Sequence, residues 1–132
     1  MHRFIILVSL TALLLPAQTK KILFAGSTPE LVADYQAVTN KARIVAVTPQ
    51  TIMQEIADAD AFIGEIKPAE VRAGKNLKWV QLRSAGVERV LHLSGGNDLR
   101  DSAIVLTNNQ VVQGPEIADH AMAMLLAHTR GL

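Results

Sequence analysis

Apolar and polar positions alternate along this chain in short blocks, which predicts strands and helices that follow one another. Five apolar runs are short and bounded by glycine, proline or polar residues, as buried parallel strands usually are. They lie at residues 21–26, 43–47, 61–64, 79–82 and 104–106. We therefore expect five strands in this order.

The segments between these runs carry the signals of helices. Ser27-Thr28-Pro29-Glu30 combines an N-cap hydroxyl, an early proline and a glutamate, so a helix should begin there. Thr48-Pro49 gives a second cap of the same kind, and a third short helix is expected over residues 68–75. The apolar positions of the first two helices are Leu31, Val32, Tyr35 and Val38, and then Ile52, Met53, Ile56 and Ala57.

Strands that alternate with helices over short connectors predict a parallel sheet with right-handed crossovers. The fold class is therefore α/β, a flavodoxin-like sheet of about five strands with helices on both faces, formed by residues 20–112. The chain shows no internal repeat, low-complexity tract or interdomain linker.

A long helix rich in alanine, methionine and leucine is expected over residues 113–132. Gly114-Pro115 opens it, and Glu116 and Asp119 suit the positive end of the helix dipole. The helix has almost no bulky polar side, so we expect it to be covered by close neighbours. Without such neighbours, much of its apolar surface would be exposed and would need a partner.

Composition limits the classes of protein that this chain can belong to. Its 132 residues, 49% hydrophobic and 19% charged with a net charge of +1, fit one globular domain with a core of its own. A nucleic-acid partner is not expected, because that would need a concentrated basic face. Since cysteine is absent, the chain has no disulfide and no thiolate chemistry.

The first 18 residues are typical of a secretory signal peptide. Met1-His2-Arg3 is basic, the twelve residues 4–15 are apolar apart from Ser9 and Thr11, and cleavage is expected after Ala17. Twelve helical residues span about 18 Å, too short for a stable membrane span. Cleavage predicts an exported or periplasmic protein. Otherwise the segment is a buried first strand or follows a wrongly assigned start, and the protein is cytoplasmic.

Ligands of open parallel sheets gather at the carboxyl ends of the strands, near the point where strand order reverses. Four loops lie there, at residues 26–28, 64–67, 84–87 and 108–110. The loop Ser84-Ala85-Gly86-Val87 has the best chemistry, because small side chains leave backbone N–H groups open to a carboxylate. The alternative for this loop is a plain strand-to-helix turn.

The order from Leu77 onward resembles the N-terminal, substrate-binding domain of the D-isomer-specific 2-hydroxyacid dehydrogenases. It combines an apolar strand, the Ser-Ala-Gly-Val loop, a second strand, Gly114-Pro115-Glu116 and the long helix. In that family this helix crosses into a dinucleotide-binding domain. This chain ends at Leu132, where that domain would begin, so we expect it to be one part of a working enzyme.

The resemblance implies roles for the loop. It assigns the substrate's carboxylate to the backbone amides of Ala85 and Gly86, with Ser84 and Val87 flanking them, and it places Ala85 near the nicotinamide of the cofactor. It also implies NAD or NADP in the complete enzyme. The family's catalytic histidine, glutamate and arginine lie in the part beyond this chain, so no catalytic residue is expected here.

No motif for a cofactor or a metal is present. The glycines do not form G-x-G-x-x-G, and no histidine/carboxylate cluster has the spacing of metal ligands. His120 follows Asp119 directly, but neighbouring helix positions point about 100° apart, so the two do not form a dyad. His92, His120 and His128 are therefore expected to be surface or interdomain residues.

The sequence thus predicts the substrate-binding portion of an NAD(P)-dependent oxidoreductase that acts on the CH–OH group of D-2-hydroxy acids. Its partners would be a small 2-oxo or 2-hydroxy acid and a dinucleotide-binding domain, with a homodimer as an option. Alone, the chain should be inactive. The alternative is a standalone carboxylate-binding module, or a gene remnant without redox activity.

Overall fold

The computed structural model describes residues 19–131. The signal peptide expected over residues 1–18 lies outside the described residues.

The described residues form a sheet of short strands joined by helices. The elements are β1 (Lys20–Ala25), α1 (Pro29–Ala37), β2 (Ala42–Val47), α2 (Ile52–Glu55), a 3₁₀ turn (Ile56–Asp58), β3 (Ala61–Ile63), α3 (Pro68–Ala73), β4 (Trp79–Gln81), α4 (Glu88–Leu91), β5 (Val105–Thr107) and α5 (Gly114–Arg130).

The sheet is parallel throughout, with the strand order β2-β1-β3-β4-β5. This is the flavodoxin-like order, so the predicted fold class is confirmed. The register brings Phe62 of β3 between Leu23 of β1 and Val80 of β4, and all three side chains are fully buried. Strands of a parallel sheet read as apolar runs where both faces of the sheet are covered.

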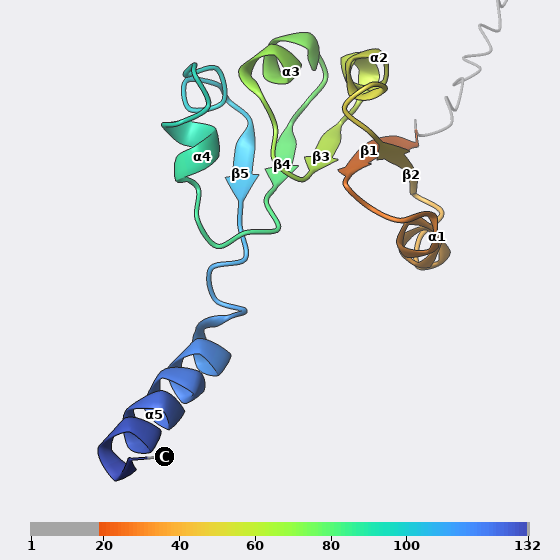
Figure 1. Cartoon of the computed structure of the whole chain (residues 1–132). Helices are drawn as coiled ribbons and strands as arrows, with labels where there is room; N and C mark the ends of the chain where they lie inside the picture. The colour runs from red at the N-terminus through yellow and green to blue at the C-terminus, as the bar shows by residue number, and fades with distance from the viewer. Residues whose placement is uncertain (1–18, 132) are drawn as a thin grey trace, which may run out of the picture.

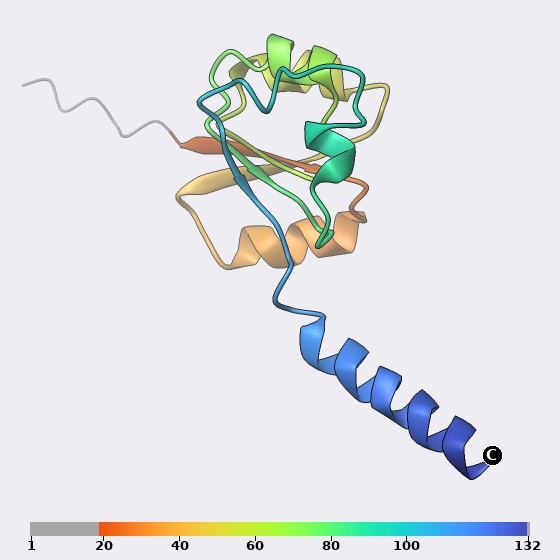
Figure 2. The ribbon, with the colours of Figure 1, turned by 90° about the vertical axis from the view of Figure 1, so that its left-hand side faces the viewer.

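Helices lie on both faces of the sheet, but they do not cover the two faces equally (Figures 1 and 2). On one face α2, α3 and α4 enclose the hydrophobic core. Its members include Ile52, Ile56, Val71 and Val90 from the helical side, packed on Leu23, Phe62, Val80 and Leu82. On the other face α1 lies beside β1 and β2, where the ring of Tyr35 meets Phe24 edge-on at 5.4 Å.

The part of this second face that is formed by β3, β4 and β5 carries no helix among the described residues (Figure 2). Trp79 and Val105 project from it and are 36% and 59% exposed. The core of the domain is therefore one-sided, and a stretch of partly apolar sheet stays open beside α1. At the carboxyl ends of the strands, this open face borders the predicted ligand loops.

The predicted long helix is present as α5, and it extends away from the sheet into open space (Figure 1). None of its residues is buried, and Ile117, Met124 and Leu125 are each more than half exposed. The close neighbours expected around this helix are thus not found among residues 19–131. No helix in this part of the chain has the length and apolarity needed to cross a bilayer.

Two sequence expectations about the helices differ from the structure. Thr28 does cap α1, where its hydroxyl accepts the backbone N–H of Leu31 at 3.3 Å, but the helix ends before Val38, which is 82% exposed. The second cap was placed too early. Thr48 and Thr51 hydrogen-bond across a tight turn, and α2 begins only at Ile52.

Charged side chains fix the amino end of the sheet, opposite the predicted ligand loops. Asp60 accepts hydrogen bonds from Lys20 Nζ at 2.8 Å and from the backbone N–H of Lys21 at 3.0 Å, and together these lower the pKa of Asp60. Burial works to lower the pKa of Lys21, but its bonds to Asp58 and Glu55 outweigh burial and raise it. This network ties β1 to the segment before β3.

Candidate functional site

A crevice opens at the carboxyl edge of the sheet, where the strand order reverses around β1. Its volume is about 600 Å³. Its walls come from the ends of β1, β3 and β4, and the residues that line it are Ala25, Gly26, Gly64, Glu65, Arg83 and Ser84. Three of the four loops predicted from the sequence thus meet at one place.

Two glycines shape the floor of this crevice. Gly26 and Gly64 have φ angles of +63° and +134°, a region that side-chain-bearing residues rarely adopt. A Cβ on Gly64 would also lie 3.0 Å from the Cβ of Ala25 on the neighbouring strand. Glycine therefore lets β1 and β3 turn away from each other abruptly and leaves the space between them open.

The loop Ser84–Val87 follows β4. The carbonyl groups of its first three residues all accept hydrogen bonds. Asn108 Nδ2 donates to the Ala85 carbonyl at 2.7 Å, and the Asn109 backbone N–H donates to the Ser84 carbonyl at 3.1 Å. The Ser84 hydroxyl donates to the Gly86 carbonyl at 2.9 Å. The first two of these bonds come from the segment after β5, so the fourth predicted loop supports the third.

The backbone N–H groups of the same three residues, in contrast, are free of protein partners among the described residues. Within residues 19–131, the backbone N–H groups of Ser84, Ala85 and Gly86 donate no hydrogen bond to a protein acceptor. Ser84 and Gly86 are exposed and Ala85 is half-buried, so an incoming ligand can reach them. Successive free N–H groups held in a fixed loop form a concavity that suits an anion.

Val87 and Glu88 close the far side of this loop. The Val87 carbonyl accepts the backbone N–H groups of Val90 and Leu91 and so starts α4, and its side chain packs on the core. Glu88 turns its carboxylate toward Gly86, so that a Cβ built on Gly86 would lie 2.6 Å from Glu88 Oε2. The Glu88 side chain is exposed, so solvent surrounds it and it is free to move away from Gly86.

Arg83 is a component of the crevice that the sequence analysis did not single out. Its guanidinium lies 5.9 Å from the ring centre of Phe24 on β1, and Nη1 donates to the Gly26 carbonyl at 3.4 Å. The side chain therefore reaches from β4 past β3 to the end of β1. The sequence does show that Arg83, a cation, immediately precedes the Ser-Ala-Gly loop.

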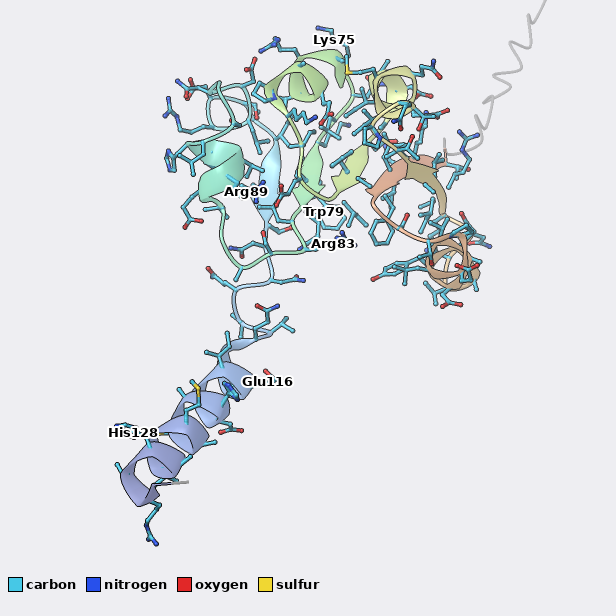
Figure 3. The ribbon with its side chains drawn as sticks, in the orientation of Figure 1. Lys75, Trp79, Arg83, Arg89, Glu116 and His128 are labelled. Carbon is cyan, nitrogen blue, oxygen red and sulfur yellow. The ribbon has the colours of Figure 1, made fainter. Side chains whose placement is uncertain are left out.

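A second hollow of about 410 Å³ lies on the open face of the sheet, beside the crevice. Aromatic residues of three elements line it, namely Phe24, Tyr35 and Trp79, and Arg83 separates it from the crevice. Trp79 and Arg83 lie close together on this side of the sheet (Figure 3). The two hollows thus share one cation.

A chain of polar groups connects this open face to the loop. Trp79 Nε1 donates to Thr107 Oγ1 at 2.8 Å, and the Thr107 hydroxyl donates to Gln81 Oε1 at 2.6 Å. Gln81 Nε2 donates to Asn109 Oδ1 at 3.1 Å, and Asn109 Nδ2 donates to the Arg83 carbonyl at 3.3 Å. Side chains of β4 and β5 therefore hold Asn109 in the orientation that supports the loop.

Within residues 19–131, no histidine lines the crevice. His92 is exposed at the end of α4, and His120 is exposed on α5. His128 is also exposed on α5 and lies away from the sheet (Figure 3). Over residues 19–131 the structure contains no group of three or more acidic or histidine side chains that could hold a metal ion. The crevice presents backbone amides, the guanidinium of Arg83 and the carboxylate of Glu65, and the first two of these are groups that bind anions.

Comparison with known proteins identifies relatives only through the fold. No protein-family model matches the sequence, and no curated protein matches it. A D-isomer-specific 2-hydroxyacid dehydrogenase family protein from Aeromonas salmonicida subsp. salmonicida A449 superimposes with a TM-score of 0.66 at 21% identity. A 2-hydroxyacid dehydrogenase from Ketogulonicigenium vulgare Y25 gives a TM-score of 0.61, also at 21% identity.

Each match covers 86% of this chain, but only 37% and 36% of the two solved chains. The chain thus spans little more than a third of the length of these enzymes. At such low identity the similarity establishes the α/β fold, and it agrees with the resemblance seen from Leu77 onward.

Proposed function

We propose that residues 20–131 form the substrate-binding domain of an NAD(P)-dependent oxidoreductase that acts on the CH–OH group of D-2-hydroxy acids. The observation that carries this proposal is the loop Ser84–Gly86, whose carbonyls are engaged while its N–H groups are free. The similarity of the fold to two 2-hydroxyacid dehydrogenase structures supports it.

In this proposal the chain's own residues bind and orient the substrate. The amides of Ala85 and Gly86 hold the carboxylate of the 2-oxo or 2-hydroxy acid, and Ser84 and Val87 set the shape of the loop. Asn108 and Asn109 keep the amides in place before the ligand arrives, which reduces the ordering cost of binding. Ala85 would be the residue nearest to the nicotinamide.

The described residues do not fit a dinucleotide as a binding site of their own. A pyrophosphate is held by a Gly-rich turn that leads into a helix N-terminus, and the crevice lacks such a turn. Pro29 opens α1 three residues after Gly26, and a charged loop follows Gly64. We therefore assign NAD or NADP to a separate dinucleotide-binding domain, and no hydride step to this chain. The exposed apolar side of α5 suits contact with that domain.

The test uses glyoxylate and pyruvate as ligands of the ¹⁵N-labelled chain. We expect the amide signals of Ser84, Ala85 and Gly86 to shift, and the variant Gly86→Val to weaken binding at least about tenfold because its side chain fills the approach to the amides. Gly86 has no left-handed φ, and its Cβ would meet only the flexible end of Glu88, so the variant should fold.

The matched control is Gly114→Val, since a Cβ at Gly114 meets nothing within 4 Å and lies outside the crevice. Equal binding by both variants would contradict the assignment of the loop. Turnover separates the proposal from a standalone carboxylate-binding module. The chain alone should not oxidise NADH with glyoxylate, whereas the chain joined to a dinucleotide-binding domain should.

A further inference from the structure

The fold holds the guanidinium of Arg83 in a defined position, but it provides no carboxylate to pair with this positive charge among residues 19–131. Within residues 19–131 it forms no ion pair with a carboxylate, and its one hydrogen bond, to the Gly26 carbonyl, is long at 3.4 Å. A guanidinium has five N–H donors in a planar fork. Most of these donors are therefore open to a ligand, while the Phe24 ring keeps the side chain in position.

This charge lies at a distance from the loop amides. The guanidinium contacts Gly26 at the end of β1, whereas the loop follows β4, and β3 lies between these two strands. Two strand spacings amount to about 9–10 Å. A single carboxylate, with hydrogen bonds of about 2.7–2.9 Å, cannot reach both groups at once.

The other charged residue of the crevice does not cancel this arrangement. Glu65 lines the same space, but its carboxylate lies 3.5 Å from Arg89 Nε on α4, on the side away from β1. The carboxylate of Glu65 thus lies toward α4, and the guanidinium of Arg83 lies toward β1. The crevice consequently offers an anion two separate contacts, one on the loop and one on Arg83.

We propose that this crevice selects a 2-oxo dicarboxylic acid, with the carboxylate beside the oxo group on the amides of Ala85 and Gly86 and the distal carboxylate on Arg83. The inference rests on the proposed function of the loop and adds the class of substrate. Arg83 acts as a specificity-determining residue, because a planar carboxylate matches its fork of donors.

The test compares two ligands of equal chain length, 2-oxoglutarate and 2-oxopentanoate, which differ only in the terminal carboxylate. Each is titrated into the ¹⁵N-labelled chain. We expect 2-oxoglutarate to bind about fivefold more tightly, as for one exposed ion pair. Arg83→Gln should remove this preference and leave the affinity for 2-oxopentanoate unchanged, whereas Arg83→Lys should keep part of it.

Arg100→Gln is the matched control, since Arg100 is also an exposed arginine but pairs with Asp101, and neither residue lines the crevice. It should retain the full preference. Equal affinities of the unmodified chain for the two ligands would overturn the inference. So would an Arg83→Gln variant that weakens both ligands alike, because Arg83 would then hold their common carboxylate.

These outcomes separate the two proposals. If 2-oxopentanoate shifts the amides of Ser84–Gly86 and no preference exists, the loop keeps its function and the inference about Arg83 is wrong. If neither ligand shifts these amides, the proposed function is wrong and the inference falls with it.

Discussion

The sheet with its helices and the helix α5 are built from similarly apolar sequence, yet they end in opposite environments. Leu23, Phe62 and Val80 are fully buried, whereas Ile117, Met124 and Leu125 on α5 are more than half exposed. The difference lies in partners and not in hydrophobicity. Apolar residues of the sheet pack on others brought together by strand pairing, whereas no residue of α5 is buried within the described part of the chain, and its apolar side chains are exposed.

The first prediction concerns the buried side of this comparison. Phe62→Ala should lower the free energy of unfolding by about 3–5 kcal/mol, because it leaves a cavity between Leu23 and Val80. Trp79 is the single tryptophan and lies in β4, so its fluorescence during urea unfolding reports the sheet and not α5. A loss below about 1 kcal/mol would show that the one-sided core is not what holds the sheet.

The second prediction concerns the charged end of the sheet. Asp60→Asn should lower the free energy of unfolding at pH 7 by about 1 kcal/mol, because Lys20 loses its charged acceptor. The pKa of Asp60 is lower in the folded chain than in the unfolded chain, so the unfolded state takes up the proton first. The contribution of Asp60 is therefore present above about pH 4 and is lost as the pH falls further.

Urea unfolding at pH 7 and pH 3 checks this sign. The unmodified chain should lose more stability between the two values than Asp60→Asn does. An equal loss in both would mean that Asp60 is not linked to folding. The acid sensitivity would then come from other carboxyl groups, such as Asp58 and Glu30, whose pKa values are also lowered in the folded chain.

The third prediction is the smallest effect and tests the other half of the comparison. Leu125→Gln on α5 should change the unfolding free energy reported by Trp79 by less than about 0.5 kcal/mol, as for an exposed site. A helix of 17 residues is only marginally stable alone, so far-UV circular dichroism should show α5 melting before the sheet. A loss above 1 kcal/mol would show that α5 packs on the sheet in solution.

Features that depend on local sequence were the ones that could be predicted. The apolar runs gave all five strands, and Thr28-Pro29 gave the start of α1 because a cap needs only neighbouring residues. The cap predicted at Thr48-Pro49 was wrong because the same residue types also form a tight turn. In this turn the Thr48 backbone N–H donates to Thr51 Oγ1. Local chemistry of this kind cannot decide between a cap and a turn.

The candidate site was predictable only in part, for a related reason. The loop Ser84–Val87 could be found from its small residues and its place after a strand. The position of the Arg83 guanidinium could not, because its contact with Gly26 joins residues 57 apart and exists only through the pairing of β1, β3 and β4. The support by Asn108 and Asn109 depends in the same way on β4 lying next to β5.

The place of these two asparagines along the chain has a mechanical consequence. Asn108 and Asn109 hold the loop carbonyls, and they are also the first residues of the connector that leads to α5. A hinge at this connector would therefore turn about the same residues that set the loop amides. Any swing of α5 would therefore act on the loop Ser84–Gly86 through Asn108 and Asn109. Under the proposed function, the movement of a domain bound to α5 would then be coupled to the binding of a carboxylate.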